Sequence, residues 1–326
     1  MRVSKRIVLG LTGTLLSTSS VRAVLGPWQE TAEAKVRLLS RFASVPAGGD
    51  AGLALEFELV PGWHVYWKNP GDAGYPPALI FAGDTLVAPR LLYPAPTRFE
   101  LPGDLVAFGY ADRVTHPLEG RLAAGAPNPA DLAATIDFLV CRESCVPRKL
   151  SLALRLPMGL AAVDPEAAPL VDSVRARLPA KAPAGVTGRL VAGDGEEMTL
   201  ELNFTVPGAR ALAQGVPQLF FETHPLLDLR RPEPIESSSG SGFCVPLRPF
   251  DETKPLPDRL HFSWTATGFE QDGAPTAWEG ELDLERPRAG RGSALARGVP
   301  IALVAFVIFL FLTRRATRAS SRSTPA

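Results

Sequence analysis

Short runs of alternating apolar and polar residues fill the chain from residue 34 to about residue 157, with Pro and Gly between the runs. Examples are residues 53–59 (LALEFEL) and 78–81 (ALIF), with turn residues at Pro61-Gly62 and Pro102-Gly103. Alternation with a period of two residues is typical of strands that bury one face. Short strands at regular spacing, punctuated by turn residues, favour a β-sandwich.

A second series of strand-like runs lies between about residues 186 and 284. We expect strands in this series at residues 198–204, 218–222, 261–265 and 278–284. The segment 164–178 is the exception to the β pattern, because Asp164 is placed to cap a helix and Pro165 suits the first helical position. A proline-rich stretch at 179–183 follows it.

These patterns predict an all-β protein made of two tandem β-sandwiches and one connecting helix. The expected first domain covers residues 30–157, the helix and linker cover 158–183, and the second domain covers 184–286. The apolar fraction of 46% is enough for two ordinary cores.

Both ends of the chain have the composition of membrane-directed segments. A basic start, an apolar stretch and small residues before Ala23 are typical of a secretory signal peptide, here residues 1–23, which is removed after export. Residues 298–313 carry no charged side chain, and a helix of this length rises roughly 24 Å. We expect one transmembrane helix there, with a buried core helix as the alternative. An exported body would then face the periplasm, anchored in the inner membrane, and residues 314–326 would form a cytoplasmic tail.

The charge balance excludes one large class of partners. Lys and Arg together number 34, as do Asp and Glu, so the chain has no net basic charge with which to bind nucleic acid. The glycine patterns of nucleotide-binding loops and the motifs of serine hydrolases and zinc proteases are also missing from the sequence. We therefore expect no cofactor and no nucleic-acid partner.

Two of the three cysteines flank a predicted turn. Cys141 follows the apolar run 134–140, and Cys145 precedes a run in which leucines alternate with other residues from 150 to 156. This arrangement predicts a hairpin with one cysteine on each arm. Residues that face each other across such a turn have Cα atoms roughly 5 Å apart, within the range that a disulfide spans.

Three roles remain open for this pair from the residues alone. A disulfide that encloses three residues removes little loop-closure entropy from the unfolded chain, so it adds little stability. A turn at the end of a sheet, in contrast, is open to an attacking thiolate. Thiol–disulfide exchange is thus one reading and a fixed structural disulfide is another. Cations near the pair in sequence would lower a thiol pKa and Glu143 would oppose them; the cations are Arg142, Arg148 and Lys149.

Metal binding is the third reading. The histidines that are available as additional ligands do not fall in a zinc-binding spacing, so we expect no metal; they are His64, His116, His224 and His261. The third cysteine, Cys244, is expected to be a small buried residue at the start of a strand, with a regulatory or resolving role as the alternative.

Four sequence blocks carry a family resemblance. They are residues 62–77 (GWHVYWKNPGDAGYPP), 94–99 (PAPTRF), 108–110 (FGY) and 139–147 (LVCRESCVP). In this order they resemble the N-terminal periplasmic region of DsbD-type thiol:disulfide interchange proteins, particularly its ScsB-like branch. The following β region resembles the second domain of that branch.

The resemblance implies immunoglobulin-like sandwiches and a redox-active pair at Cys141 and Cys145. Phe108 and Tyr110 match a loop that caps the disulfide in this family. The aromatic residues Trp63 and Tyr66, with Trp67 beside them, are candidates for lining the site or for forming core and turn. Family members usually continue into a membrane-helix bundle and a thioredoxin-like domain, where this chain has one short apolar segment.

We therefore predict a membrane-anchored periplasmic thiol-disulfide exchange module, a protein-disulfide reductase or thiol-disulfide oxidoreductase by class. It would pass electrons to or from periplasmic disulfide-containing proteins, with a separate membrane thiol-electron transporter as a partner. The alternative is a non-catalytic β-sandwich that binds or scaffolds another protein and holds a structural disulfide.

Overall fold

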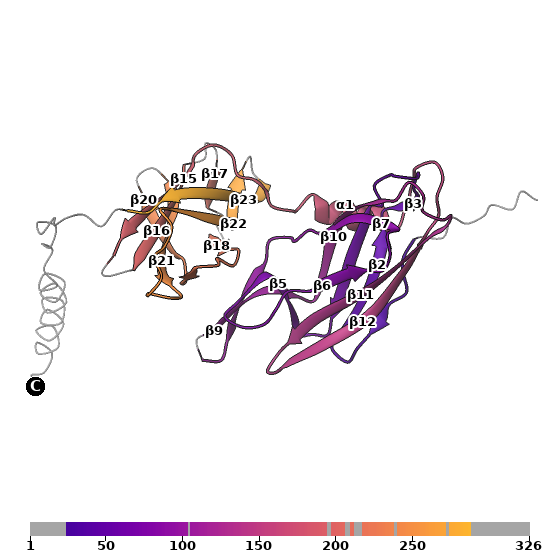
Figure 1. Cartoon of the computed structure of the whole chain (residues 1–326), viewed down its shortest axis with the longest axis horizontal. Coiled ribbons are helices and arrows are strands. Elements are labelled where there is room, and N and C mark those ends of the chain that lie inside the picture. The colour runs from indigo at the N-terminus through magenta and orange to yellow at the C-terminus, as the bar shows by residue number, and fades with distance from the viewer. Residues whose placement is uncertain are drawn as a thin grey trace, which may run out of the picture.

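The computed structural model describes residues 24–287, except 104, 194–196, 206–208, 212–216, 238–239 and 272–273. The predicted signal peptide, 1–23, and the predicted transmembrane segment and tail, 298–313 and 314–326, lie outside the described residues. Within the described part, no helix combines the length and apolarity needed to cross a membrane. The described residues form two β-rich domains that follow one another along the chain (Figure 1).

The first domain consists mainly of two sheets. One has the strand order β1-β2-β4-β10-β7, and its strands are β1 (Gln29–Glu30), β2 (Ala34–Ser40), β4 (Leu53–Leu59), β7 (Leu86–Leu91) and β10 (Arg113–Leu122). The other has the order β12-β11-β5-β9-β8, with β6 also paired to β11. Its strands are β5 (His64–Gly71), β6 (Ala78–Phe81), β8 (Thr97–Leu101), β9 (Leu105–Ala111), β11 (Ala130–Cys141) and β12 (Cys145–Leu156). A separate two-stranded sheet, formed by β3 (Phe42–Ser44) and β13 (Ala162–Val163), completes the domain.

The core of this domain lies between the two large sheets. Alternate residues of β4 and β11 point into it, and the rings of Phe57 and Phe138 meet edge to face with centroids 5.2 Å apart. Both side chains are fully buried, and burial of such a side chain stabilises a fold by roughly 1.5–3 kcal/mol. The strands expected at 53–59 and 78–81 are confirmed with the same bounds. The immunoglobulin-like topology stays a prediction.

The connecting helix is shorter than expected. Helix α1 (Ala167–Arg175) begins after a turn that contains Pro165, so this proline precedes the helix instead of occupying its first position. Asp164 still serves the helix start, because its carboxylate accepts hydrogen bonds from the backbone N–H groups of Glu166 and Ala167 at 2.9 and 2.8 Å. The buried face of α1, with Ala167 and Val171, packs on the first domain.

The second domain also consists of two sheets. The first has the order β14-β23-β22-β17 with β18 also paired to β22, and the second has the order β15-β16-β21-β19 with β20 also paired to β21. The strands are β14 (Ala180–Lys181), β15 (Val186–Ala192), β16 (Met198–Phe204), β17 (Ala209–Ala211), β18 (Gln218–Phe221), β19 (Leu227–Leu229), β20 (Glu233–Ser237), β21 (Gly240–Pro249), β22 (Arg259–Gln271) and β23 (Ala274–Glu285). Each of the four predicted strands is present, and the described chain is mostly β, as expected.

Candidate functional site: a disulfide at the end of a sheet

The two cysteines close the end of the longest hairpin in the first domain. Strands β11 and β12 pair without interruption from Ala130 opposite Leu156 to Cys141 opposite Cys145. Alternating apolar side chains along most of both strands favour this register, since a slip by one residue would turn the core side chains outward. The two cysteines form a disulfide with Cα atoms 4.1 Å apart. The predicted hairpin and its bridge are therefore both present.

The two sulfur-bearing residues differ in their access to solvent. Cys141 is 2% exposed because its strand lies between two neighbours, β12 and β5. Cys145 is exposed, since it is the first residue of β12, the last strand in the order of its sheet. An outside thiolate thus meets Cys145 first.

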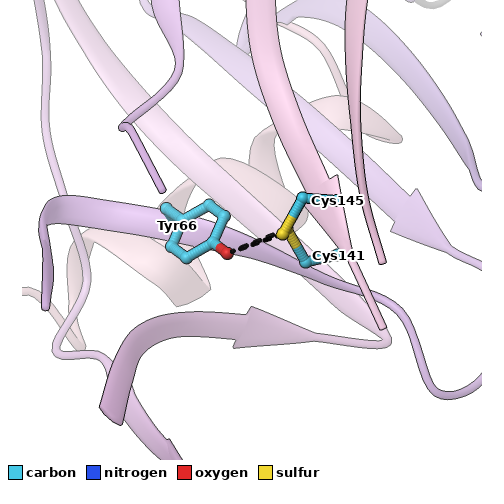
Figure 2. Close-up of a disulfide and its surroundings, with 3 residues drawn as sticks. All are labelled: Tyr66, Cys141 and Cys145. Atoms are coloured by element: carbon cyan, nitrogen blue, oxygen red, sulfur yellow. Dashed lines mark hydrogen bonds between the residues drawn. A yellow bond between two sulfur atoms is a disulfide. The ribbon is translucent and has the colours of Figure 1, made fainter. Parts of the chain in front are cut away.

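Tyr66 is the polar group that contacts the disulfide. Its hydroxyl donates a hydrogen bond to Cys141 Sγ at 2.8 Å and lies 3.5 Å from Cys145 Sγ. Figure 2 shows this hydroxyl pointing at the disulfide from β5. Burial raises the pKa of Tyr66, so the hydroxyl keeps its proton and remains a donor at neutral pH.

Apolar side chains cover Cys141 on the same side. A small buried cluster unites Tyr66, Ala107 and Cys141, with Phe99 and Leu101 of β8 packed against it. These two β8 residues are the cover that sequence reasoning missed. Phe99 falls in one of the four family blocks, but the pairing of β8 with β9 that brings it here is a tertiary feature.

Two glycines at and after the end of β5 let the chain pass close to the tyrosine ring. Gly71 and Gly74 have φ angles of +87° and +101°, a region that residues with a Cβ adopt at a cost. A methyl group on Gly74 would overlap the ring of Tyr66, and one on Gly71 would overlap the backbone of β9. The motif GDAG at 71–74 therefore lets the turn fold flat against the tyrosine.

His64 is a second group that sequence reasoning did not connect with the cysteines. It is the register partner of Cys141 across the β5–β11 ladder, and its ring stacks on Phe99 with centroids 4.6 Å apart. It is 4% exposed, and its Nε2 has no hydrogen-bond partner within the described chain. Burial lowers the pKa of His64, which favours a neutral ring. The sequence signal that could have placed His64 near the site is its position two residues before Tyr66, because residues two apart on a strand point to the same face.

The other predicted lining residues lie against the core of the first domain. Phe108 packs on that core and meets the ring of Phe220 edge to face at 5.1 Å. Tyr110 is 7% exposed, and its hydroxyl donates to the backbone oxygen of Pro94 at 2.7 Å. Trp63 also packs on the core. Of the four predicted lining residues, the structure brings Tyr66 to the sulfurs, and the capping role of Phe108 and Tyr110 stays a prediction.

Two of the three cations near the pair in sequence, Arg148 and Arg142, have partners other than the sulfurs. Arg148 donates two hydrogen bonds, at 2.6 and 2.9 Å, to the buried carboxylate of Glu33. These bonds hold the pKa of Glu33 below its ordinary value. The guanidinium of Arg142 lies 5.1 Å above the ring of Trp63. Among the described contacts of the sulfurs, the polar partner is thus a tyrosine hydroxyl and not a cation.

Potential metal ligands do not gather at this site. Within the described ranges, no three His, Cys, Asp or Glu side chains form a cluster that would hold a metal ion. Cys244 is unpaired and half-buried in β21 of the second domain. Burial, followed by the charges of Glu201 and Glu233, raises the pKa of its thiol, which makes it a poor nucleophile.

Comparison with known proteins agrees with this geometry. The sequence model of the family described as "Thiol:disulfide interchange protein DsbD, N-terminal" matches residues 35–157. A crystal structure of the N-terminal periplasmic domain of ScsB from Proteus mirabilis aligns with a TM-score of 0.64 at 17% identity, covering 81% of this chain and 100% of that chain. The aligned 81% of this chain is longer than residues 35–157, so the likeness in fold includes strands of the second domain.

Two further comparisons add nothing to the assignment. The structure of the Enterococcus faecalis MSCRAMM ACE aligns at 10% identity over 78% of this chain and 96% of that chain, with a TM-score of 0.18 that carries no argument. No curated protein matches the chain.

The family match and the bonded cysteines bear on the same residues. Both strands of the cysteine hairpin and the β5 tyrosine fall inside the matched segment. Together they support a thiol-disulfide exchange module and a periplasmic location. Residues 35–157 therefore belong to the family of DsbD-type N-terminal domains, of which the ScsB-like form shares the fold.

Proposed function

We propose that this protein is a periplasmic thiol-disulfide oxidoreductase module in which Cys145 attacks the disulfide of a partner protein and Cys141 resolves the mixed disulfide. The observation that carries the proposal is the unequal exposure of the pair, with Cys145 open to solvent and Cys141 at 2% exposure. A partner's sulfur can approach Cys145 in line with the sulfur–sulfur bond, as exchange requires.

The reaction proceeds in two exchanges. The Cys145 thiolate attacks one sulfur of the partner's disulfide, a Cys145–partner bond forms, and the partner's other sulfur leaves as a thiolate. The Cys141 thiolate then attacks the Cys145 sulfur, the mixed bond breaks, and the partner's second thiolate leaves. The Cys141–Cys145 disulfide has formed, and two electrons have passed to the partner.

Tyr66 assists the second exchange in this scheme. Its hydroxyl lies 2.8 Å from Cys141 Sγ, where a donated hydrogen bond stabilises the thiolate over the thiol. A lower thiol pKa raises the fraction of Cys141 that is ready to attack at neutral pH. The apolar cover from β8 and β9 keeps Cys141 away from unrelated thiols.

The partners follow from the same chemistry. The substrates are periplasmic proteins with disulfides, and the reductant is a separate membrane thiol-electron transporter that reduces the Cys141–Cys145 bond. The apolar segment 298–313 anchors the module in the inner membrane, and the signal peptide 1–23 directs its export. The sequence pattern of these two segments supports this placement.

A trapping experiment tests the proposal. The full chain with Cys141→Ser, expressed in the envelope of its host, is expected to accumulate mixed disulfides through Cys145, seen as reducible high-mass bands. Cys145→Ser is the matched control and is expected to trap far less, because the sulfur that remains is covered. Equal absence of trapped partners in both variants would contradict exchange. A reduction potential below about −300 mV would also contradict it, because fixed structural bridges have such values.

A further inference from the structure

One aromatic side chain of the second domain belongs to the core of the first. Phe220 lies on β18 and is 1% exposed, and it packs with the first domain's hydrophobic cluster. Its ring meets Phe108 edge to face at 5.1 Å and Trp67 at 6.1 Å. The neighbouring β18 residues, Leu219 and Phe221, pack in the core of the second domain. Strand β18 therefore contributes side chains to both cores, with Phe220 in the core of the first domain.

The strands that receive Phe220 are also the strands that cover the disulfide. On β5, Trp67 contacts Phe220 while the preceding residue, Tyr66, contacts Cys141 Sγ. On β9, Phe108 contacts Phe220 while the preceding residue, Ala107, lies in the cluster with Cys141. Successive strand residues point to opposite faces, so Phe220 supports from one face the two strands that carry the disulfide's cover on the other.

Polar contacts flank the aromatic contact. Lys68 forms an ion pair with Glu222, and the side-chain amide of Asn69 donates to the backbone oxygen of Phe221 at 2.8 Å. Lys68 and Asn69 follow Tyr66 and Trp67 directly on β5. The second domain thus contacts three consecutive residues of β5, beginning immediately after Tyr66.

The β8–β9 hairpin separates the disulfide from a cavity between the domains. Arg98, Val106 and Phe108 line one wall of this cavity of about 460 Å³, and Phe221, His224 and Phe250 line the other. The alternate hairpin residues Phe99, Leu101 and Ala107 pack in the disulfide cluster. The hairpin thus faces the cavity on this side, and its Phe108 contacts Phe220 there.

We infer that Phe220 is a positioning residue for the redox site: from the second domain, it holds β5 and β9 so that Tyr66 and the β8–β9 hairpin cover Cys141. The inference rests on the proposed exchange function, to which it adds a role for the second domain. Removal of the ring leaves Trp67 and Phe108 without their packing partner, so β9 and its hairpin loosen. Small reagents then reach the sulfur of Cys141 more readily.

The test measures alkylation of the Cys141 thiol by iodoacetamide, at one alkaline pH, in the full chain with Cys145→Ser and Cys244→Ser, where Cys141 is the thiol that remains. Phe220→Ala is expected to raise the second-order rate constant about tenfold, or about 1.4 kcal/mol. Phe220→Leu keeps most of the apolar volume and is expected to fall between Phe220→Ala and the chain that keeps Phe220. Hydrogen exchange gives the structural readout: backbone amides of β9 are expected to lose protection in Phe220→Ala.

A matched control removes a phenylalanine that has only a structural role. Phe243 is 1% exposed and packs in the core of the second domain, so Phe243→Ala is expected to lower stability without changing the alkylation rate of Cys141. An unchanged rate in Phe220→Ala, or an equal rise in Phe243→Ala, would overturn the inference. If Phe220→Ala fails to fold, Phe220→Leu decides, and a rate equal to that of the chain that keeps Phe220 overturns it. Iodoacetamide needs no protein partner, so this result is independent of the trapping experiment that tests exchange.

Discussion

The hydroxyl of Tyr66 lies 2.8 Å from the sulfur of Cys141, although the two residues are 75 positions apart in the sequence. The pairing of β5 with β11 places both side chains on one face of the sheet, and the burial of Tyr66 keeps its hydroxyl protonated. When the disulfide opens, the same hydroxyl is in position to stabilise the Cys141 thiolate.

Tyr66→Phe is therefore expected to raise the pKa of the Cys141 thiol by about one unit. Hydrogen bonds to charged groups contribute roughly 1.5–3 kcal/mol, and one pKa unit is about 1.4 kcal/mol, with the lower end suited to a sulfur acceptor. Ultraviolet absorbance of the thiolate, titrated against pH in a Cys145→Ser, Cys244→Ser background, measures it. Tyr75→Phe is the control, since that hydroxyl bonds to Asp137. Superimposable titration curves for Tyr66→Phe and its parent would refute the role.

Gly74→Ala is expected to reproduce this shift without altering the tyrosine. The added methyl group would overlap the ring of Tyr66 and force it away from the sulfurs. Gly83→Ala is a matched control, because Gly83 also has a positive φ, +65°, but no atoms close to the position of a Cβ. Both variants bear the backbone cost, roughly 1 kcal/mol. We expect a raised Cys141 pKa in Gly74→Ala alone, and a shift of equal size in both variants would argue against the steric explanation.

Arg148→Met is expected to lower the free energy of unfolding at neutral pH, and by more than the loss of an exposed surface pair does. It leaves the carboxylate of Glu33, which is 6% exposed, without its charge partner, and an unpaired buried charge is strongly destabilising. Arg155→Met on the same strand is the control, because Arg155 and Asp131 are 70% and 71% exposed and 3.7 Å apart. Loss of that pair is expected to cost less than about 1 kcal/mol.

Acid is expected to remove the contribution of the Glu33–Arg148 pair. The hydrogen bonds from Arg148 hold the pKa of Glu33 below its ordinary value of 4.5 in the folded state. Stability from the pair is therefore complete above that value and is lost as the pH falls through the folded-state pKa. Chemical denaturation at neutral and at acidic pH measures the free energy of unfolding of Arg148→Met and Arg155→Met. If the difference in stability between these two variants does not shrink in acid, the Glu33–Arg148 pair is not its cause.

His116 is expected to make the fold less stable in mild acid. It is fully buried among the rings of Phe57, Tyr93 and Tyr110, and burial lowers its pKa from 6.5 to about 4. In the unfolded chain His116 is protonated below about pH 6.5, whereas in the folded chain it is protonated only below about pH 4. Stability is therefore lost across this window, by up to about 3 kcal/mol, and levels off below it.

His116→Gln is expected to flatten that pH dependence. The free energy of unfolding, measured by denaturant titration at pH values within and above the window, is expected to change less in the variant than in the parent. A slope that is the same in both proteins would show that another group titrates.

Much of the fold and the cysteine pair could be predicted from the sequence, because the physical causes are local. Alternation within a single strand identified β4 at 53–59 and β16 at 198–204 with their observed bounds. The Cys141–Cys145 pair was equally readable, since a hairpin brings together residues that are close in sequence.

The surroundings of the pair depended on tertiary structure, because they come from strands that are distant in sequence. The pairing of β5 with β9 and of β9 with β8 brings Ala107, Phe99 and Leu101 to the cluster around Cys141, while Phe108 packs on the core of the first domain. Phe220 lies more than 100 residues along the chain from the first residues of β5 and β9, the two strands that it contacts. Alternation tells which residues share a face of one strand, but only the packed sheets decide which distant strand that face meets.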